Sequence, residues 1–460
     1  MPIARRIDLE ALYGRLPIVL QNRICSAEGR RLERQRYGKG YQSVLADAEQ
    51  RARSPQAVAT AYRDARLQAF VGHCARTVPY YRDWFRDCGV DAADIRTLAD
   101  LPALPVLTKA DVQANIDDFQ SDSTLRRERV ATHTSGSTGA GLRFSTTVSA
   151  IREQYAVWWR YRGWHGLEHG VWCGHFGARS VVPASQKTPP YWRYDRPGRR
   201  VMFSGYHMSE SRLGAYIEEL RKRRLPWLHG FPSTLALLAA HVVEHGVDLG
   251  YDVRWVTVGG ENLLAAQAEV IARAFGVRPV QHYGLAEAVA NISECERGRL
   301  HVDEDFAAVE FLPEDTGQGH RIVGSNFTNP ATPLLRYDTG DVVTIDEQGC
   351  DCGRPGRVVA AIDGRQEDYV ELGNGARVGR MDHVFKDMTN IREAQVVQKR
   401  AGELEIRVVR GSGYSESDER ELLREMVKRV GEETGVRIRY VDHLERGPGG
   451  KLRFVVSEIA

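Results

Sequence analysis

The chain has 460 residues, of which 42% are hydrophobic and 27% charged, so it can bury a large core and form more than one domain. The 63 Lys and Arg residues nearly balance 61 Asp and Glu residues, and the formal net charge of +2 excludes a strong global attraction to nucleic acid or to a membrane surface. No stretch approaches the ~20 apolar residues that span a bilayer, and the N-terminus lacks an apolar segment of signal-peptide length. We therefore expect a cytoplasmic protein that binds no nucleic acid and inserts into no membrane.

The first 120 residues are predicted to form a helical layer, because long charged stretches alternate there with helix-compatible runs. In "LTKADV", Thr108 and Asp111 have the spacing of a capping box, which starts a helix. From about Arg129 the pattern changes to short β-rich runs separated by helical segments: "VWCGHF", "VRWVTVGG", "RPVQHYG", "HRIVGSNF" and "DVVTI". Strands that alternate with helices predict a mostly parallel, layered α/β core over residues 121–366.

A smaller set of elements follows residue 366. The runs "AQVVQK", "ELEIRVVR" and "VRIRYVDHL" are predicted strands, and Ser415 and Asp418 cap a predicted amphipathic helix between the second and the third. The apolar face of this helix consists of Leu422, Leu423, Met426, Val427 and Val430. The predicted fold class is therefore α/β, with a large N-terminal domain over residues 1–366 and a small α+β domain over residues 367–460.

The segment "THTSGSTGAG", residues 132–141, is rich in glycine and hydroxyl side chains. Glycines let backbone N–H groups approach an anion closely, and serine and threonine hydroxyls add donors that fit phosphate oxygens. The segment has neither the Gly-Lys-Ser/Thr of a Walker loop nor the glycine spacing of the dinucleotide fingerprint. By itself it leaves open both a phosphate-binding loop and an ordinary exposed loop.

Further motifs follow this loop in a fixed order: "HYGLAEA", "LLRYDTGD", "GRQED" and "PGGKLR". Together with "TSGSTG" they resemble the motif series of the adenylate-forming superfamily, which contains acyl- and aryl-CoA ligases, nonribosomal peptide adenylation domains and luciferases. Four more stretches, "VPYYRDWF", "LPALPVLTKADV", "GFPSTLALLA" and "VGGENL", narrow the resemblance to the phenylacetate-CoA ligase-like branch. Within that branch the sequence is similar to the CapK-like or coenzyme F synthetase-like subgroup.

The resemblance implies a role for each residue that matches a motif. The β- and γ-phosphates of ATP would be bound by the loop residues Thr134, Ser135, Gly136, Ser137, Thr138 and Gly139. Tyr283 would stack on adenine, and Asp341 and Arg365 would bind the ribose. Further nucleotide contacts would come from Gly260, Glu261, His282 and Gly284. For single residues the alternatives stay open: a core tyrosine, a turn aspartate or a surface salt bridge of the arginine.

Two residues are expected to be catalytic by the same resemblance. Glu287 would hold Mg²⁺ against the phosphates, since a carboxylate is a hard oxygen ligand for a hard cation. Lys451 would bridge the substrate carboxylate and the α-phosphate, although a lysine beside glycines can also be simply solvated. Glu367 occupies the hinge about which the small domain would move. Ala286, where many relatives carry threonine, and Gly141, where proline is frequent, are departures that we interpret as features of the branch.

The acyl pocket implied by the resemblance is lined by His175, Phe176, Phe231, Gly259 and His282. Aromatic and histidine side chains suit a planar or aryl acid, yet aryl acetates, benzoates, short acyl acids and amino acids all remain open. Trp158 and Trp159, which follow the loop on a predicted helix, are interpreted as packing residues.

Four residues form a candidate zinc site. Cys295 is followed six positions later by His301, and Cys350 and Cys352 form a pair in "GCDCGR". Three thiols and an imidazole are the ligand set that tetrahedral Zn²⁺ prefers. The alternative is unpaired buried thiols, because C-x-C is a less usual zinc spacing than C-x₂-C and lone cysteines often behave as small hydrophobes. Four protein ligands would make such a zinc structural, not catalytic.

The predicted function is ATP-dependent activation of a small carboxylic acid to an acyl-adenylate with release of pyrophosphate, followed by transfer to a thiol acceptor, with CoA as the default. The expected cofactors are ATP, Mg²⁺ and CoA, with structural Zn²⁺ as the open case. The alternatives are acyl transfer to a carrier protein, a sugar or an amine in polysaccharide or secondary metabolism, an adenylyltransferase that stops at AMP transfer, and a non-catalytic nucleotide-binding relative. A homodimer also stays open.

Overall fold

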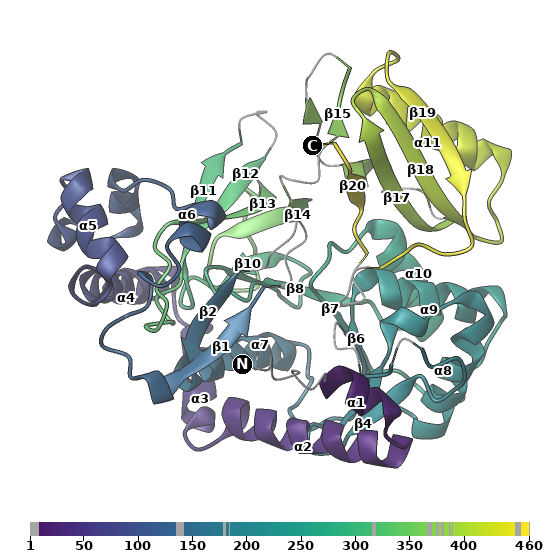
Figure 1. Ribbon diagram of the computed structural model, residues 1–460, viewed down its shortest axis with the longest axis horizontal. Helices are drawn as coiled ribbons and strands as arrows, with labels where there is room; N and C mark the ends of the chain where they lie inside the picture. Colours follow the sequence, from purple (N-terminus) through teal and green to yellow (C-terminus); the bar gives the residue numbers. More distant parts are fainter. Residues whose placement is uncertain are drawn as a thin grey trace, which may run out of the picture. The chain divides into compact units, whose positions relative to one another are not determined.

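The computed structural model describes residues 9–134, 142–177, 181–183, 185–314, 319–365, 370–373, 377–378, 381–385, 388, 390–446 and 452–459 (Figure 1). The chain divides into two compact units. The first unit comprises Met1–Arg34, Gly170–Pro279 and Tyr369–Ala460, and the second comprises Gln35–His169 and Val280–Asp368. The predicted domain boundary at residues 366 and 367 falls outside the described residues and stays a prediction.

In the first unit, five strands pair in the order β7-β6-β3-β5-β4. Their bounds are Cys173–Phe176 for β3, Trp192–Asp195 for β4, Arg200–Phe203 for β5, Trp227–Gly230 for β6 and Trp255–Val258 for β7. Strands β5, β3, β6 and β7 are parallel, and only β4 is antiparallel to its neighbour. Helices α8 (Glu210–Arg223) and α9 (Pro232–Glu244) supply the crossovers that parallel strands require. The predicted parallel α/β arrangement is confirmed here.

The remaining helices of this region are α1 (Leu9–Arg15), α2 (Ile18–Tyr37), α10 (Ala265–Phe275) and the short 3₁₀ helix η4 (Gly205–His207). Strands β3 to β7 and helices α8, α9 and α10 contribute to one hydrophobic core, in which Phe176, Phe203, Tyr216 and Leu228 are buried. The aromatic rings of Phe176 and Phe203 stack, with their centroids 4.5 Å apart.

The C-terminal part of the first unit has four strands in the order β19-β18-β17-β20, covered by α11 (Figure 1). The elements are β15 (Val370–Glu371), β16 (Arg377–Val378), η5 (Met381–Phe385), β17 (Ile391–Arg400), β18 (Glu403–Arg410), α11 (Glu416–Val430), β19 (Gly435–Tyr440) and β20 (Val455–Ser457). The predicted capping box of Ser415 and Asp418 is present, and Leu422, Met426 and Val430 of α11 are buried against the sheet. The predicted α+β composition of this segment is confirmed.

The second unit begins with helices. They are α3 (Tyr41–Arg51), α4 (Gln56–Thr77), α5 (Pro79–Cys88), η1 (Ala92–Asp94), η2 (Leu98–Ala103), α6 (Lys109–Ala114), η3 (Arg126–Glu128) and α7 (Val148–Trp164). The capping box of Thr108 and Asp111 starts α6 as predicted, with Asp111 N–H donating to Thr108 Oγ1 over 3.2 Å. Strands β1 (Arg129–His133) and β2 (Arg143–Thr147) form an antiparallel hairpin before α7.

Seven further strands of the second unit pair in the order β11-β12-β13-β14-β10-β9-β8. Their bounds are Val280–Gly284 for β8, Asn291–Glu294 for β9, Leu300–Val302 for β10, Ala308–Pro313 for β11, His320–Ser325 for β12, Tyr337–Ile345 for β13 and Val358–Arg365 for β14. All of these pairings are antiparallel. The predicted mostly parallel core is therefore wrong for this unit. Its described connections contain no helix, and without a crossover helix successive strands pair as hairpins.

These seven strands form a strongly curved sheet. Strands β14, β10 and β9 lie between β13 and β8 in the strand order, so a flat sheet would hold β13 and β8 roughly 19 Å apart at about 4.8 Å per strand. The Tyr283 hydroxyl of β8 nevertheless lies 2.7 Å from the Asp341 carboxylate of β13. The curvature brings together two residues that lie far apart along the sheet.

Candidate functional site

The first element of the site is the contact between Tyr283 and Asp341. The Tyr283 hydroxyl donates a hydrogen bond of 2.7 Å to Asp341 Oδ2. Asp341 is buried, with 7% of its surface exposed, and its backbone N–H donates to Thr339 Oγ1 over 3.1 Å. The side chain of Asp341 is thus fixed both by its own strand and by the opposing tyrosine.

Burial raises the pKa of Tyr283 well above its usual value, and the nearby carboxylates of Asp341 and Glu287 raise this pKa further. A tyrosine with a raised pKa keeps its proton at neutral pH, so its hydroxyl remains a hydrogen-bond donor. The arrangement is therefore a neutral donor facing a carboxylate.

Glu287 lies in the turn between β8 and β9 and is buried, with 8% of its surface exposed. A residue from another part of the sheet stabilises the turn: the Asn326 side-chain amide donates to the Glu287 backbone carbonyl over 2.9 Å. Asn326 in turn accepts a hydrogen bond of 2.7 Å from the Leu334 backbone N–H. Ala288, the next residue, has φ 57°, a left-handed conformation that costs about 1 kcal/mol or more for a residue with a Cβ. The fold thus imposes this turn on the chain.

His282 is positioned by α7. Its Nδ1 lies 3.1 Å from the Tyr161 hydroxyl, and the two rings stack with their centroids 5.0 Å apart. The Trp158 ring lies 5.4 Å from the same imidazole, and its indole N–H donates to Asn291 Oδ1 over 2.9 Å. Trp158 and Tyr161 are three residues apart and share one face of the helix.

Gly284, the last residue of β8, lies close to the Trp158 and Asn291 side chains. A Cβ at this position would lie 2.9 Å from Asn291 Oδ1 and 3.4 Å from Trp158 Nε1. The close approach of Trp158 and Asn291 therefore requires a glycine.

The glycine- and hydroxyl-rich segment joins β1 to β2. The Thr134 backbone N–H donates to the Leu142 carbonyl over 3.0 Å, and the Leu142 N–H donates to Thr134 Oγ1 over 2.9 Å. Thr132 and His133, at the start of the expected loop, belong instead to β1, where Thr132 pairs with Phe144. The described pairing of the hairpin therefore extends as far as Thr134 and Leu142.

Several expected site residues lie outside the described residues: Ser135, Gly136, Ser137, Thr138, Gly139, Glu367 and Lys451. Arg365 ends β14, and its backbone pairs with Asp341, but its side chain is not among those described. The roles expected for these residues stay predictions.

The other expected residues belong to the first unit. His175 in β3 stacks on His229 of β6 with centroids 5.3 Å apart, whereas Phe176 is fully buried in the core. Gly259 and Gly260 follow β7, and a Cβ on Gly260 would lie 3.0 Å from the Phe231 ring. The carboxyl ends of β3, β6 and β7 thus gather these residues at one edge, which is where ligands bind in parallel sheets.

Glu261 contacts the chain next to the expected catalytic lysine. Its Oε1 accepts a hydrogen bond of 2.9 Å from the backbone N–H of Leu452, and its Oε2 accepts one of 3.2 Å from the N–H of Ser233. Arg446 also donates to Ser233 Oγ over 2.8 Å and pairs with Glu393. The Glu261 carboxylate thus links the backbone at Leu452 to the backbone at Ser233 within the first unit.

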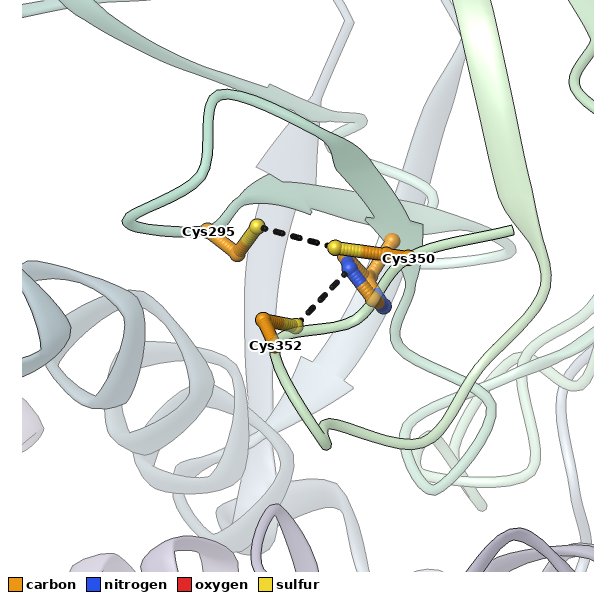
Figure 2. A group of neighbouring side chains, drawn as sticks. Cys295, Cys350 and Cys352 are labelled. Carbon is orange, nitrogen blue, oxygen red and sulfur yellow. Dashed lines mark hydrogen bonds between the residues drawn. The ribbon is translucent and has the colours of Figure 1, made fainter. Parts of the chain in front are cut away.

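A second cluster lies in the second unit (Figure 2). Cys295 follows β9, His301 lies in β10, and Cys350 and Cys352 lie between β13 and β14. Cys295 Sγ is 3.8 Å from Cys350 Sγ, and Cys352 Sγ is 3.4 Å from His301 Nε2. The four ligand atoms all lie within 4.8 Å of one another. The four candidate metal ligands therefore do meet in space, as the zinc hypothesis requires.

Burial raises the pKa of both Cys295 and Cys352, the latter to about 12, and lowers the pKa of His301. Without a neighbouring cation the two thiols and the imidazole are all neutral at pH 7.

The sequence analysis missed Tyr161 and Asn326. Tyr161 has a weak signal in "WWRY", where Trp158 and Tyr161 are spaced to share one helix face. Asn326 has no local signal, since its role depends on a turn 39 residues away.

The fold is similar to that of a solved CoA ligase. The solved structure of 2-hydroxyisobutyryl-CoA ligase in the postadenylation state, in complex with an acyl-AMP, superposes with a TM-score of 0.69 at 18% identity and covers 89% of this chain and 91% of its own. The fold class predicted from the sequence is confirmed.

The sequence relatives are more specific. Residues 371–458 match the CapK C-terminal domain. Protein CapK of Staphylococcus aureus is 24% identical over 98% of this chain and 100% of its own length. The phenylacetate-coenzyme A ligase of Thermus thermophilus is 26% identical over 69% of this chain and 72% of its own. The predicted resemblance to the phenylacetate-CoA ligase-like branch and to CapK is confirmed. Among the described residues, no helix has the length and apolar character needed to cross a membrane.

Proposed function

We propose that this protein is an AMP-forming acid-CoA ligase. In the first step a carboxylate oxygen attacks the α-phosphorus of ATP, which forms an acyl-adenylate and releases pyrophosphate. In the second step the sulfur of CoA attacks the acyl carbonyl, which forms a thioester and releases AMP. The homologous phenylacetate-coenzyme A ligase of Thermus thermophilus supports this reaction class.

The observation that carries the proposal is the hydrogen bond between Tyr283 and Asp341 beside the turn of Glu287. Asp341 is proposed to accept the two ribose hydroxyl protons, which a carboxylate can do and an amide cannot do in full. Tyr283 holds that carboxylate in place, and its ring is proposed to stack on adenine. Glu287, in the turn that follows β8, is proposed to supply an oxygen ligand for Mg²⁺.

The first step must overcome the repulsion between a carboxylate and a triphosphate. Mg²⁺ on Glu287 and the ammonium of Lys451 are proposed to supply the positive charge. At ~4 Å and an effective dielectric constant near 20, one charge pair is worth on the order of 4 kcal/mol. Thr134 and its neighbours up to Gly139 are proposed to donate to the β- and γ-phosphates. The acyl pocket is proposed to involve His175, Phe231 and Gly259 of the first unit.

A second candidate concerns the acceptor only. Residues 371–458 match the CapK C-terminal domain, and Protein CapK of Staphylococcus aureus is similar to this chain over 98% of its length. The second candidate is therefore transfer to an acceptor other than CoA, such as a carrier thiol, a sugar hydroxyl or an amine.

The test is ATP-dependent pyrophosphate release with Mg²⁺ over a panel of aryl and alkyl carboxylic acids, with AMP measured in parallel. We expect one class of acid to trigger pyrophosphate release and CoA then to liberate AMP. Pyrophosphate release with AMP freed only by a non-CoA acceptor would favour the second candidate. If ATP binds but no acid triggers pyrophosphate release, the ligase proposal is wrong.

A further inference from the structure

The cysteine and histidine cluster joins three segments of the second unit that are far apart in sequence. Cys295 starts the β9–β10 turn, His301 lies in β10, and Cys350 and Cys352 lie in the β13–β14 connection. Gly349 and Gly353, which flank the cysteine pair, have φ of 69° and 77°. These left-handed residues turn the connection sharply, so that both thiols face the hairpin in Figure 2.

The distances match a tetrahedral metal centre. Zn–S bonds of ~2.3 Å and Zn–N bonds of ~2.0–2.1 Å place neighbouring ligand atoms about 3.8 Å apart for two sulfurs and about 3.6 Å apart for sulfur and nitrogen. The observed separations are 3.8 Å for Cys295 and Cys350 and 3.4 Å for Cys352 and His301. A disulfide would need a sulfur separation of ~2.05 Å. The cluster therefore has the dimensions of a metal site and not of a disulfide.

The surrounding groups are those that orient metal ligands. His301 Nδ1 lies 3.3 Å from the Pro355 carbonyl, which fixes the proton on Nδ1 and turns the lone pair of Nε2 toward Cys352. The Arg354 backbone N–H donates to Cys352 Sγ over 3.5 Å. Such a donor stabilises negative charge on sulfur.

We propose that Cys295, His301, Cys350 and Cys352 bind one structural Zn²⁺ that clamps the β9–β10 hairpin to the β13–β14 connection. Four protein ligands complete the coordination, so the metal takes no part in the chemistry. Three soft sulfur ligands and one imidazole exclude Mg²⁺ and Ca²⁺, which require oxygen ligands.

The clamp has a mechanical consequence for the candidate nucleotide site. Strand β9 pairs with β8, with Tyr283 opposite Ile292, and β14 pairs with β13, with Asp341 opposite Arg365. The zinc joins the ends of the strands that lie between Tyr283 and Asp341 in the sheet. It therefore stabilises the curvature that this pair needs.

The experiment measures zinc in the full-length protein purified under reducing conditions with zinc in the medium. We expect one equivalent of zinc per chain, and loss of most of it in Cys295→Ser and Cys352→Ser. The matched control is Cys88→Ser, because Cys88 is also half-buried but ends α5, outside the cluster. Cys88→Ser should keep the zinc of the wild type.

Two further measurements protect the test against variants that fail to fold. Chelation of the wild-type protein should lower its midpoint of thermal unfolding, and added Zn²⁺ should restore it. Replacement of zinc by Co²⁺ should give the absorption of a tetrahedral thiolate centre. The proposal is overturned by wild-type protein without zinc, by a Cys295–Cys350 disulfide in the non-reduced protein, or by zinc that survives in both serine variants.

Discussion

Two clusters of the second unit lie on the strands and turns of one curved sheet and differ in the atoms that they offer. Tyr283, Glu287 and Asp341 offer oxygens, whereas the second cluster offers three sulfurs and an imidazole nitrogen. Oxygen ligands suit Mg²⁺, which keeps several waters and leaves with its substrate, whereas thiolates enclose Zn²⁺ completely. Taken together, the two proposals assign an exchangeable site and a permanent cross-link to one sheet.

The largest effect is expected for Lys451→Ala. Removal of one oriented charge should lower acid-dependent pyrophosphate release by roughly 10²- to 10³-fold. Transfer of the acyl group from a premade acyl-adenylate to the acceptor should survive, and zinc content should not change. Equal damage to both half-reactions would contradict a role confined to adenylation.

Glu287→Gln should lower the same activity by roughly 10²-fold, because an amide oxygen carries no charge to hold Mg²⁺. The isosteric change keeps the backbone carbonyl that Asn326 binds, so the midpoint of thermal unfolding should stay close to that of the wild type. The check is pyrophosphate release titrated with Mg²⁺. An unchanged Mg²⁺ dependence would remove Glu287 from the metal site.

Removal of the cross-link should affect stability more than chemistry. Cys352→Ser should lower the free energy of unfolding by about 2–4 kcal/mol, the typical range for the loss of a disulfide cross-link, because the zinc likewise joins distant segments of the chain. Pyrophosphate release per folded molecule, measured at low temperature, should stay within a few-fold of the wild type. A loss of activity as large as that of Glu287→Gln, with the fold intact, would break the separation between the two clusters.

Gly284→Ala tests the contact between β8 and α7. The new Cβ would lie 2.9 Å from Asn291 Oδ1, so we expect about 1–3 kcal/mol of destabilisation from overpacking. Denaturant unfolding measures it. The control is Gly214→Ala in α8, where a Cβ meets nothing within 4 Å and alanine should be neutral or stabilising. Equal stability of the two variants would contradict the close approach.

The smallest effect is expected for Tyr161→Phe. It removes the hydroxyl that lies 3.1 Å from His282 Nδ1, and a hydrogen bond of this kind is worth about 0.5–1.5 kcal/mol. The kcat/KM for the acid should fall by roughly 2- to 10-fold. Tyr155→Phe, six residues earlier on α7, is the control. If both variants keep wild-type kcat/KM, Tyr161 does not position His282 for function.

Local patterns predicted what depends on local physics. The caps of α6 and α11 and the strands β17 and β18 are set by neighbouring residues, so the sequence alone indicates them. Pairing direction depends on which distant strand lies alongside. This is why the core over residues 121–366 was expected to be mostly parallel, whereas its strands β8–β14 pair antiparallel.

The site was predicted to a similar extent. Motif order indicated Tyr283, Glu287 and Asp341, and ligand chemistry indicated the four residues of the second cluster. The residues that hold the motifs in place had a weak signal, in the case of Tyr161, or none, in the case of Asn326. Asn326 and Tyr161 act on Glu287 and His282 through contacts that exist only once the sheet is folded.

The curvature of the sheet also sets the order in which the protein can assemble. Tyr283 and Asp341 are 58 residues apart, and their contact forms only after the strands between them have paired. Non-local closures of this kind are slow steps in folding, because the entropy of the intervening chain is lost first. A nucleotide that bridges both residues would bind only the closed sheet and would stabilise it by mass action. ATP would then act as a folding ligand as well as a substrate.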